Sequence, residues 1–160
     1  MKVHELMTPA PHSTTPEANL ASVASTMWFG DCGAVPVLDE ERRVIGLLTD
    51  RDICIALSSK SRAAAEVYVR EMLAGAVVTC GAGDDVHDAL AVMRRHQVRR
   101  LPVVDEDRRL VGLFSLTDAV MSAGSGDEAP TADEVLETLR AVSKPHLRAP
   151  RPVGSEGEVF

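Results

Sequence analysis

Two seven-residue segments carry a hydroxyl and an acid at the same spacing, GLLTDRD (residues 46–52) and GLFSLTD (residues 112–118). Each follows an apolar run and is expected to lie where a strand passes into a helix. Thr49 and Ser115 would then offer a hydroxyl donor beside the unpaired N–H groups and positive dipole end of the helix, which favour an anion such as phosphate. The glycine that opens each segment would let a ligand approach the backbone closely.

An aspartate three residues after each hydroxyl extends this chemistry. Asp52 and Asp118 could each accept two hydrogen bonds from a cis-diol, the group that a ribose presents. A phosphate site beside a ribose site indicates a nucleotide. A structural explanation stays open, because Thr or Ser followed three residues later by an acid also forms a capping box that needs no ligand. The second copy in the same context favours the ligand site.

The two segments belong to a longer internal repeat. Residues 3–57 align without a gap on residues 69–123, each residue matching the one 66 positions later. The first-copy residues that meet an identical residue are Val3, Glu5, Met27, Pro36, Val37, Asp39, Glu40, Arg42, Arg43, Gly46, Leu47 and Asp52. Such self-similarity predicts two copies of one structural unit.

Each copy predicts the order β-α-β-β-α. A short extended piece leads into a helix, which in the first copy Thr15 would cap, with Pro16 at the first helical position. Two apolar runs joined by a charged turn, DEER in the first copy and DEDR in the second, predict a hairpin that ends in the segment with the hydroxyl and the aspartate. A second helix follows.

Helical spacing predicts the buried face of the first helix in each copy. These residues are Leu20, Val23, Ala24, Met27 and Trp28 in the first copy and Val86, Ala89, Leu90 and Met93 in the second. One unit alone would leave a face of its small sheet wet, so the two units should pack about an approximate twofold axis. The predicted fold class is α+β, with two equivalent clefts where the copies meet.

The composition narrows the choice of partners. A length of 160 residues with 45% hydrophobic content fits a globular chain. The net charge of −7 and the absence of a Lys/Arg run argue against nucleic acid or a membrane as the main partner. We find no signal peptide or membrane span and expect a cytoplasmic location. Cys32, Cys54 and Cys80 form no C-x-x-C pair and are expected to be small buried hydrophobes.

Catalysis and metal binding find little support. Ser115 lies in GLFSL rather than in a G-x-S-x-G segment, and no cysteine stands beside a base in the sequence, so we predict no catalytic residue and no enzyme. Asp84, Asp85, His87 and Asp88 open the first helix of the second copy, where acids favour the helix dipole. We therefore predict a helix start there and no metal site.

The ungapped pair of units, the strands AVPV and RLPVV and the two repeated segments resemble a tandem pair of CBS (cystathionine β-synthase) domains, a Bateman module, over about residues 1–123. The segments TDRD and HQVRR are similar to those of free-standing actinobacterial CBS-pair proteins. The resemblance implies a regulatory sensor that commonly forms a disk-like homodimer. It also implies that the clefts bind AMP, ADP, ATP or S-adenosylmethionine, and sometimes NAD or cyclic dinucleotides, as regulatory ligands rather than as a required cofactor.

The resemblance also implies roles for individual residues. The hydroxyls of Thr49 and Ser115 would meet phosphate, and the aspartate of each segment would meet ribose. The first strand of each repeat would line the slot for adenine. These strand residues are Thr14 and Thr15 in the first repeat and Cys80 in the second.

Basic residues should make the two clefts unequal. In the family, basic residues just before the Leu-Pro pair often contact phosphate, which here implies Arg99 and Arg100. An exposed arginine pair is an equal alternative, since neighbouring strand residues face opposite sides and only one can enter a given cleft. Arg51 in TDRD is a further candidate, and Thr117 takes its place in the second copy. We expect unequal affinities in the two clefts.

A C-terminal helix is predicted after a GSGDEAP linker. Thr131 and Glu134 would form its capping box, and its apolar stripe comprises Val135, Leu136, Leu139 and Val142. Such a short helix must dock on its own module, a second copy or a partner. The predicted divisions are CBS repeat 1 at 1–60, a linker at 61–68, CBS repeat 2 at 69–123, a linker at 124–132, the helix at 133–144 and a disordered tail at 145–160.

Two functions follow from these observations. The first is a non-enzymatic regulatory module that binds an adenosine-containing nucleotide and signals by a conformational change to an unidentified effector protein. The alternative is a ligand-independent interaction protein, or a redox-responsive one, whose nucleotide clefts are vestigial.

Overall fold

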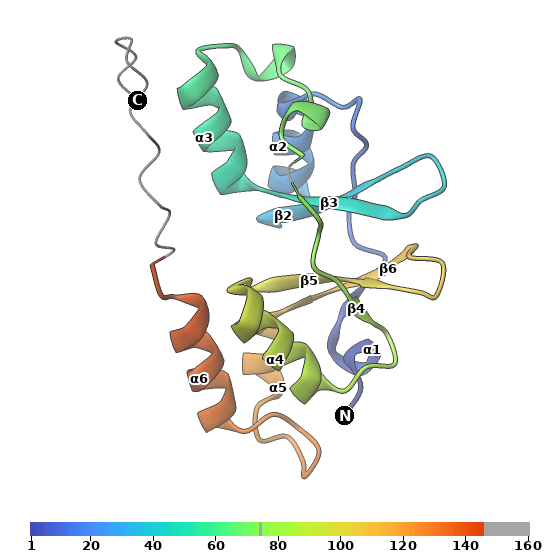
Figure 1. The fold of residues 1–160 in the computed structure, drawn as a ribbon, viewed down its shortest axis with the longest axis vertical. Coiled ribbons are helices and arrows are strands. Elements are labelled where there is room, and N and C mark those ends of the chain that lie inside the picture. The colour runs from blue at the N-terminus through green and yellow to red at the C-terminus, as the bar shows by residue number, and fades with distance from the viewer. Residues whose placement is uncertain (74, 146–160) are drawn as a thin grey trace.

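The computed structural model describes residues 1–73 and 75–145, and two similar halves stack with their sheets facing each other (Figure 1). The first part of the chain forms α1 (Val3–Leu6), β1 (Thr8–Pro9), α2 (Leu20–Phe29), β2 (Ala34–Leu38), β3 (Val44–Thr49) and α3 (Asp50–Lys60). Two short 3-10 turns follow, η1 (Ala64–Glu66) and η2 (Val69–Glu71). The second part forms β4 (Cys80–Gly81), α4 (Val86–His96), β5 (Arg100–Val104), β6 (Leu110–Ser115), α5 (Leu116–Ser122) and α6 (Ala132–Val142).

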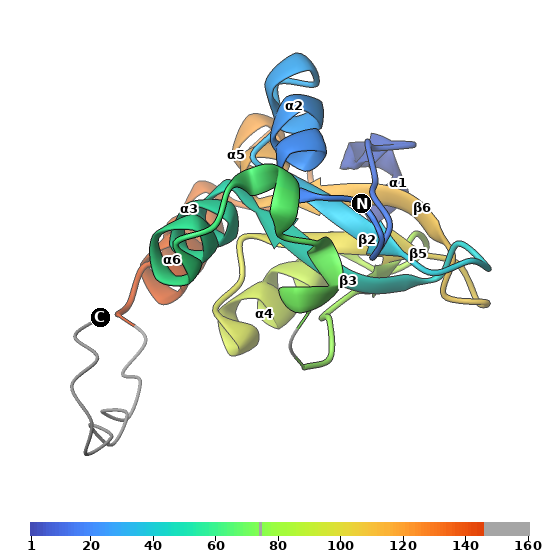
Figure 2. The same cartoon turned by 90° about the horizontal axis from the view of Figure 1, so that it is seen from above.

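The two predicted hairpins form with the same register. Ala34 of β2 pairs with Thr49 at the end of β3, and Arg100 of β5 pairs with Ser115 at the end of β6. The tips of both hairpins extend to the same side of the molecule (Figure 2), where residues 43 and 109 form an isolated bridge. Each hairpin therefore places its hydroxyl residue at the end of its second strand, opposite the first residue of the first strand. The predicted α+β repeat architecture is confirmed.

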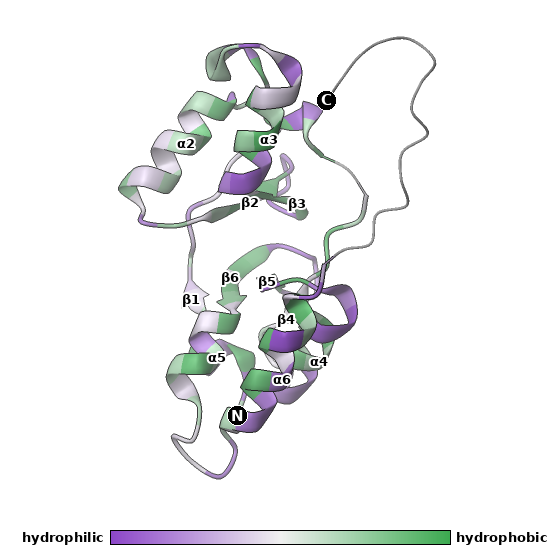
Figure 3. Cartoon of the chain, turned by 90° about the vertical axis from the view of Figure 1, so that its left-hand side faces the viewer, coloured by the Kyte–Doolittle hydropathy of each residue, from purple (hydrophilic) through white to green (hydrophobic). Residues whose placement is uncertain are grey.

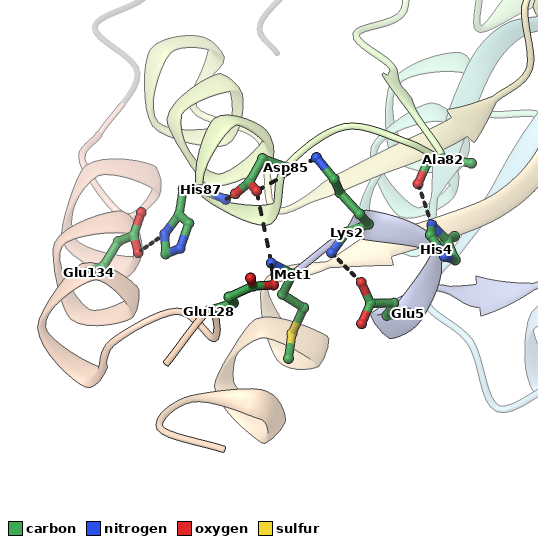
Figure 4. A network of polar contacts seen from close by, with 9 residues as sticks. All are labelled: Met1, Lys2, His4, Glu5, Ala82, Asp85, His87, Glu128 and Glu134. Carbon is green, nitrogen blue, oxygen red and sulfur yellow. Dashed lines mark hydrogen bonds and ion pairs between the residues drawn. The ribbon is translucent and has the colours of Figure 1, made fainter. Parts of the chain in front are cut away.

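The two packed halves exchange the segments that open the two repeats. Val3 of α1 belongs to the core of the second half, whereas Val69, its repeat mate, belongs to the core of the first. The N-terminus is tied to the second half by polar contacts (Figure 4), in which His4 Nδ1 lies 3.0 Å from the carbonyl oxygen of Ala82 and the Met1 amino group 3.1 Å from the Glu128 carboxylate. The boundaries of the two repeats along the sequence remain a prediction. In the structure, the first residues of each repeat pack in the core of the other half.

The start of α2 differs from the prediction. Thr15 does not cap this helix; Asn19 does, because its side-chain oxygen accepts the N–H of Ser22 at 2.9 Å. The backbone carbonyls of Pro16 and Ala18 instead accept hydrogen bonds from residues 70 and 69. These tertiary bonds hold the segment extended up to the cap.

The buried face of α2 is also narrower than predicted. Leu20, Val23 and Met27 are buried as expected. Ala24 is exposed, and 82% of the Trp28 surface is exposed. The prediction that these two residues are buried was wrong.

Helix α6 docks on its own chain, against α4 and α5. Thr131 caps it by accepting the N–H of Glu134 at 3.1 Å, and Val135 and Val142 are buried. Leu136 and Leu139 of the predicted stripe stay about two-fifths exposed. The predicted tail from residue 146 onward lies outside the described residues. Within the described part of the chain, we find no helix long and apolar enough to cross a membrane.

Candidate ligand-binding cleft

The first segment with a hydroxyl and an aspartate forms a reciprocal cap at the start of α3. Thr49 is the N-cap, and its hydroxyl lies 2.6 Å from Asp52 Oδ2, which also accepts the Thr49 backbone N–H at 3.0 Å. The hydroxyl in turn accepts the N–H of Asp52 at 3.2 Å. This arrangement satisfies backbone donors that the first turn of a helix otherwise leaves unpaired.

The second segment repeats this geometry at the start of α5. Asp118 Oδ2 accepts the hydroxyl and the backbone N–H of Ser115, both at 2.7 Å. All four side chains in the two caps are partly buried. In both aspartates the bonds fall on Oδ2, and Oδ1 has no hydrogen-bond partner among residues 1–73 and 75–145. The capping explanation therefore accounts for one carboxylate oxygen and leaves the other available to a ligand.

The glycines of the two segments have a role that the sequence analysis did not predict. A Cβ atom on Gly46 would overlap Leu73, and one on Gly112 would overlap Met7. Each glycine thus leaves room for a side chain from the opening segment of the other repeat. They serve the exchange of segments between halves, rather than the approach of a ligand.

A cleft of about 170 Å³ lies beside the second segment and is lined by both repeats. Ser115, Asp118 and Arg100 come from the second repeat. Residues 31–34 and Thr8 come from the first part of the chain. A hydroxyl, a carboxylate and a guanidinium therefore meet at one cleft, as a phosphate and a diol would require.

Arg100 enters this cleft, and Gly33 provides the room. A Cβ atom on Gly33 would lie 3.4 Å from Arg100 Nη2 and 3.1 Å from Asp50 Oδ2, so the guanidinium and the carboxylate of Asp50 lie against a residue without a side chain. Arg99, the repeat mate of Gly33, is exposed and is not among the residues that line the cleft. Only one of the two adjacent arginines therefore enters the cleft, as expected for neighbouring residues that face opposite sides.

The other candidate residues lie elsewhere. Arg51 is exposed on α3. Thr14 is partly buried and bridges Val37 in parallel, and Thr15 is exposed beside it. Cys80 occupies the matching place on β4, paired with Val103. Arg100, Ser115 and Asp118 thus line one cleft. The residues that are not part of its lining are Arg51, Thr14, Thr15 and Cys80.

Burial makes Cys80 a poor nucleophile. Only 5% of its surface is exposed, and this burial, together with the nearby charge of Asp84, raises the pKa of the thiol to about 12. Cys54 is exposed, contrary to expectation, and Cys32 is partly exposed at the cleft beside Asp118. The prediction of small buried cysteines therefore holds for Cys80 alone.

A larger open hollow of about 640 Å³ lies away from the two repeated segments. It is lined by the end of β4 with the residues that follow it (Gly81, Ala82 and Gly83) and by the end of β5 with the following turn (residues 104–107). This lining contains three acids and no basic residue, so it does not suit a phosphate. Asp85 caps α4 by accepting the N–H of His87, as the predicted helix start requires. Across residues 1–73 and 75–145, no group of three or more His, Cys, Asp or Glu side chains is placed to hold a metal ion.

Sequence reasoning missed the part of the cleft that comes from the first repeat. Thr8, Asp31, Cys32 and Gly33 carry no motif of their own. The internal repeat contained a usable signal, because residues 31–33 are the repeat mates of residues 97–99, which lead into the strand that carries Arg100. This correspondence places residues 31–33 just before the first hairpin strand of their repeat, but the cleft that they line depends on how the two repeats face each other.

The chain matches the CBS domain family over residues 3–59 and 69–123. It is 32% identical over 130 residues to the CBS domain-containing protein YhcV of Bacillus subtilis, covering 81% of this chain and 91% of that protein. It is 34% identical over 99 residues to hypoxic response protein 1 of Mycobacterium tuberculosis, covering 62% and 68% of the two chains. By contrast, the chain covers only 22% of the inosine-5'-monophosphate dehydrogenase of Aquifex aeolicus, to which it is 30% identical over 111 residues.

Solved structures share the fold. The crystal structure of Hypoxic Response Protein I with two coordinated zinc ions matches with a TM-score of 0.69 and 30% identity, over 76% of this chain and 98% of that one. The CBS domain pair of MJ0100 in complex with 5-methylthioadenosine and S-adenosyl-L-methionine matches with a TM-score of 0.69 and 21% identity, over 76% and 94%. CBSX2 in complex with AMP matches with a TM-score of 0.64 and 22% identity, over 75% and 93%. With two family matches in tandem and this fold, the chain belongs to the CBS domain family as a CBS-domain pair.

Proposed function

We propose that this chain is a non-enzymatic regulatory module that binds an adenosine-containing nucleotide between its CBS repeats. The observation that carries the proposal is the meeting of Arg100, Ser115 and Asp118 at one cleft lined by both repeats. Arg100 supplies the positive charge for phosphate, the Ser115 hydroxyl supplies a donor and the free Oδ1 of Asp118 accepts from the ribose diol.

The structural neighbours support the choice of ligand class. Two CBS-pair structures with the same fold carry AMP, or S-adenosyl-L-methionine with 5-methylthioadenosine, and all of these molecules contain adenosine. Of these, AMP brings the phosphate that the guanidinium of Arg100 would bind. We therefore place AMP, ADP and ATP first among the regulatory ligands, with S-adenosylmethionine next, and propose that none is a required cofactor.

The size of the cleft supports a conformational response. Pockets that hold a drug-sized ligand have volumes of about 300–1,000 Å³. At about 170 Å³ the present cleft holds only part of a nucleotide, so a complete nucleotide would extend beyond it or would bind a form in which the repeats are further apart at this edge. A ligand that prefers the wider arrangement shifts the population toward it, and a separate effector protein would read that change.

The first of the two predicted clefts, expected beside Thr49 and Asp52, is proposed as the weaker site. Thr49 and Asp52 have the same capping geometry, but the first-repeat residue that corresponds to Arg100 is Ala34. Arg51 and Arg99 are the basic residues left to it. We also keep the homodimer implied by the family as part of the proposal.

Calorimetric titration with AMP, ATP, S-adenosylmethionine, NADH and cyclic di-AMP tests the proposal. Asp118→Ala should weaken binding of the preferred ligand more than Asp52→Ala does, and the double variant should abolish it. Asp88→Ala, an exposed acid in the first turn of α4, is the matched control and should bind normally. Circular dichroism checks that each variant is folded. Unchanged affinity in both single variants and the double would refute the site, and no binding of any compound would favour the ligand-independent alternative.

A further inference from the structure

The cleft beside Ser115 is acidic apart from one arginine. Its charged lining residues are Arg100 and Asp118 from the second repeat and Asp31 from the first. Within the described part of the chain, the arginines that form ion pairs are Arg43, Arg62, Arg94 and Arg109. The Arg100 guanidinium is not engaged in such a pair there. A ligand in this cleft therefore meets one positive charge and two negative charges.

Asp31 is held at the cleft by the turn that ends α2. Its backbone has a φ of +46°, and Gln97, which occupies the same place after α4, has a φ of +52°. The chain turns sharply at this point, because the N–H of the next residue, Cys32, donates back to the Met27 carbonyl at 3.0 Å. Aspartate is among the few residues besides glycine that adopt such a φ readily. The end of the helix therefore fixes the place of Asp31 at the cleft.

The fold makes no use of the Asp31 carboxylate within residues 1–73 and 75–145. The aspartates whose carboxylates accept hydrogen bonds there are Asp39, Asp50, Asp52, Asp84, Asp85, Asp105, Asp107 and Asp118. Asp31 is not one of them, and its side chain is exposed. Its charge can therefore act on a ligand, and its removal should leave the fold intact.

A third carboxylate lies close to Arg100. Asp50 Oδ1 accepts the N–H of Arg51 at 2.7 Å, which fixes this side chain at the start of α3. Asp50 Oδ2 and Arg100 Nη2 both lie within 3.4 Å of one point, the place of a Cβ atom on Gly33. Figure 3 shows a purple, hydrophilic turn of α3 next to β2, where the helix begins. Carboxylates of the first repeat thus lie around the only guanidinium of the cleft.

These charges limit how many phosphates a ligand can place in the cleft. The guanidinium of Arg100 can bind one phosphate through paired hydrogen bonds, but the lining contains no second basic residue for another. Arg51 and Arg99 are exposed and lie outside the lining. Each further phosphate adds about one negative charge or more. Like charges placed together weaken binding, so the carboxylates disfavour every phosphate after the first.

We propose that Asp31, with Asp50 close to Arg100, makes this cleft select adenosine ligands that carry one phosphate over those that carry two or three. The inference rests on the proposed function, because it concerns the ligand of the same cleft, and it ranks AMP above ADP and ATP. The residues that correspond to Asp31 and Asp50 in the second repeat are Gln97 and Leu116, which carry no charge. Selection by these carboxylates therefore belongs to the cleft beside Ser115 alone.

Cys32 provides a readout that is confined to this cleft, because it is partly exposed and lines it. In a chain with Cys54→Ser, a thiol reagent should modify Cys32 more slowly as a nucleotide fills the cleft, and the concentration that halves the rate measures affinity. The titrations are made without Mg²⁺ at about 10 mM salt, where charges act over about 30 Å. Two added unit charges about 6 Å from one carboxylate weaken binding about tenfold even at the dielectric constant of water. ATP should therefore bind about tenfold or more weakly than AMP, with ADP between them.

Two variants remove the charge of Asp31. Asp31→Asn keeps the shape of the side chain, and Asp31→Gln introduces the residue type that adopts the same turn at position 97. Both should strengthen ATP binding about tenfold and AMP binding less, and leave adenosine binding unchanged. A purely structural effect would change the binding of all three compounds alike. Asp127→Asn, at an exposed position outside the cleft, changes the net charge equally and should keep the wild-type preference. Circular dichroism checks that each variant is folded.

The outcomes separate this inference from the proposed function. Equal binding of AMP and ATP by the wild type, or a preference that both Asp31 variants leave unchanged, would overturn the inference while AMP binding upholds the proposed function. Tighter binding of ATP than of AMP when Mg²⁺ is added would also overturn the inference, because the carboxylates would then hold the cation. Protection of Cys32 by none of the compounds would overturn both.

Discussion

Ser115 donates both its hydroxyl and its backbone N–H to one oxygen of the Asp118 carboxylate, each at 2.7 Å. The two groups proposed to hold phosphate and ribose therefore hold each other in the structure. A serine hydroxyl has one proton, so it can donate to a phosphate only by giving up its bond to Asp118. The backbone N–H bond remains and keeps the carboxylate in place while Oδ1 meets the ribose.

The same relationship makes the hydroxyls structural as well as functional. Ser115→Ala and Thr49→Ala should each lower the free energy of unfolding by about 1 kcal/mol, because the first turn of the helix loses its cap. Urea unfolding measures this change. Ser58→Ala, at an exposed hydroxyl inside α3, should change stability by less than about 0.5 kcal/mol. Equal stabilities for the wild type and both cap variants would contradict the capping geometry.

Arg100 should distinguish ligands by their phosphate. Arg100→Ala removes a charged hydrogen-bond donor, so the affinity for AMP should fall by about 1.5–3 kcal/mol, or about 10- to 150-fold, while the affinity for adenosine stays the same. Titration calorimetry with both ligands checks this. Arg95→Ala, at an exposed position on α4, should leave both affinities unchanged. A matching loss for adenosine would show that Arg100 supports the cleft rather than the phosphate.

The sequence predicted the features that depend on local pattern. The register that places Thr49 and Ser115 at strand ends follows from the hairpins, and each hairpin is specified by its own apolar runs and turn. The start of α2 could not be predicted this way. Thr15 and Pro16 have the types of a helix start, but carbonyls of the segment pair with residues 69 and 70, which are distant in the sequence. Tertiary hydrogen bonds decided the boundary.

The candidate site was predictable to the same extent. Arg100, Ser115 and Asp118 come from one repeat and could be recognised by their motif, whereas the wall at residues 31–34 depends on how the repeats face each other. The periodicity of α2 grouped Trp28 with Met27 on one buried face, but Met27 is buried and Trp28 is 82% exposed. Periodicity along one helix does not show which neighbouring element covers it. Helix α6 packs on α4 in the second repeat, whereas Trp28 on α2 of the first repeat stays exposed.

The three cysteines should differ in reactivity. The pKa of Cys80 is raised to about 12 by burial and by the charge of Asp84, so almost no thiolate is present at pH 8. A thiol-specific disulfide reagent should modify exposed Cys54 in the folded chain and Cys80 only after urea is added. Cys54→Ser should remove the reaction of the exposed thiol and leave the slower reaction of partly exposed Cys32, and Cys80→Ser should remove the reaction that requires urea. Rapid modification of Cys80 in the native chain would revive a redox role for that residue.

Glu71 should make the protein sensitive to acid. Hydrogen bonds from the Tyr68 N–H, Lys60 and Arg62 lower the pKa of Glu71 from its ordinary 4.5 to about 2. A carboxyl whose pKa is lowered by folding stabilises the fold above the unfolded-state pKa, and this stability is lost as the pH falls through the folded-state value. Urea unfolding at several pH values should therefore show a smaller loss of stability between pH 4.5 and 2 in Glu71→Gln than in the wild type. Glu106→Gln, in an exposed hairpin turn, should keep the wild-type slope.

The contact between Arg94 and Thr138 should show how firmly α6 is docked. Thr138 is completely buried, and its hydroxyl accepts from Arg94 Nη1 at 2.8 Å and donates to the Glu134 carbonyl oxygen at 2.9 Å. Thr138→Val keeps the shape but leaves the guanidinium without this acceptor, so the free energy of unfolding should fall by about 1–2 kcal/mol. Arg94→Met keeps most of the packing and removes the donor. In a double-mutant cycle measured by urea unfolding, the double variant should be more stable than the sum of the single losses predicts, by about 0.5 kcal/mol or more. Additive losses would mean that the hydrogen bond between Arg94 and Thr138 does not help to hold α6 on α4, and the contact between His87 and Glu134 would be the next one to test.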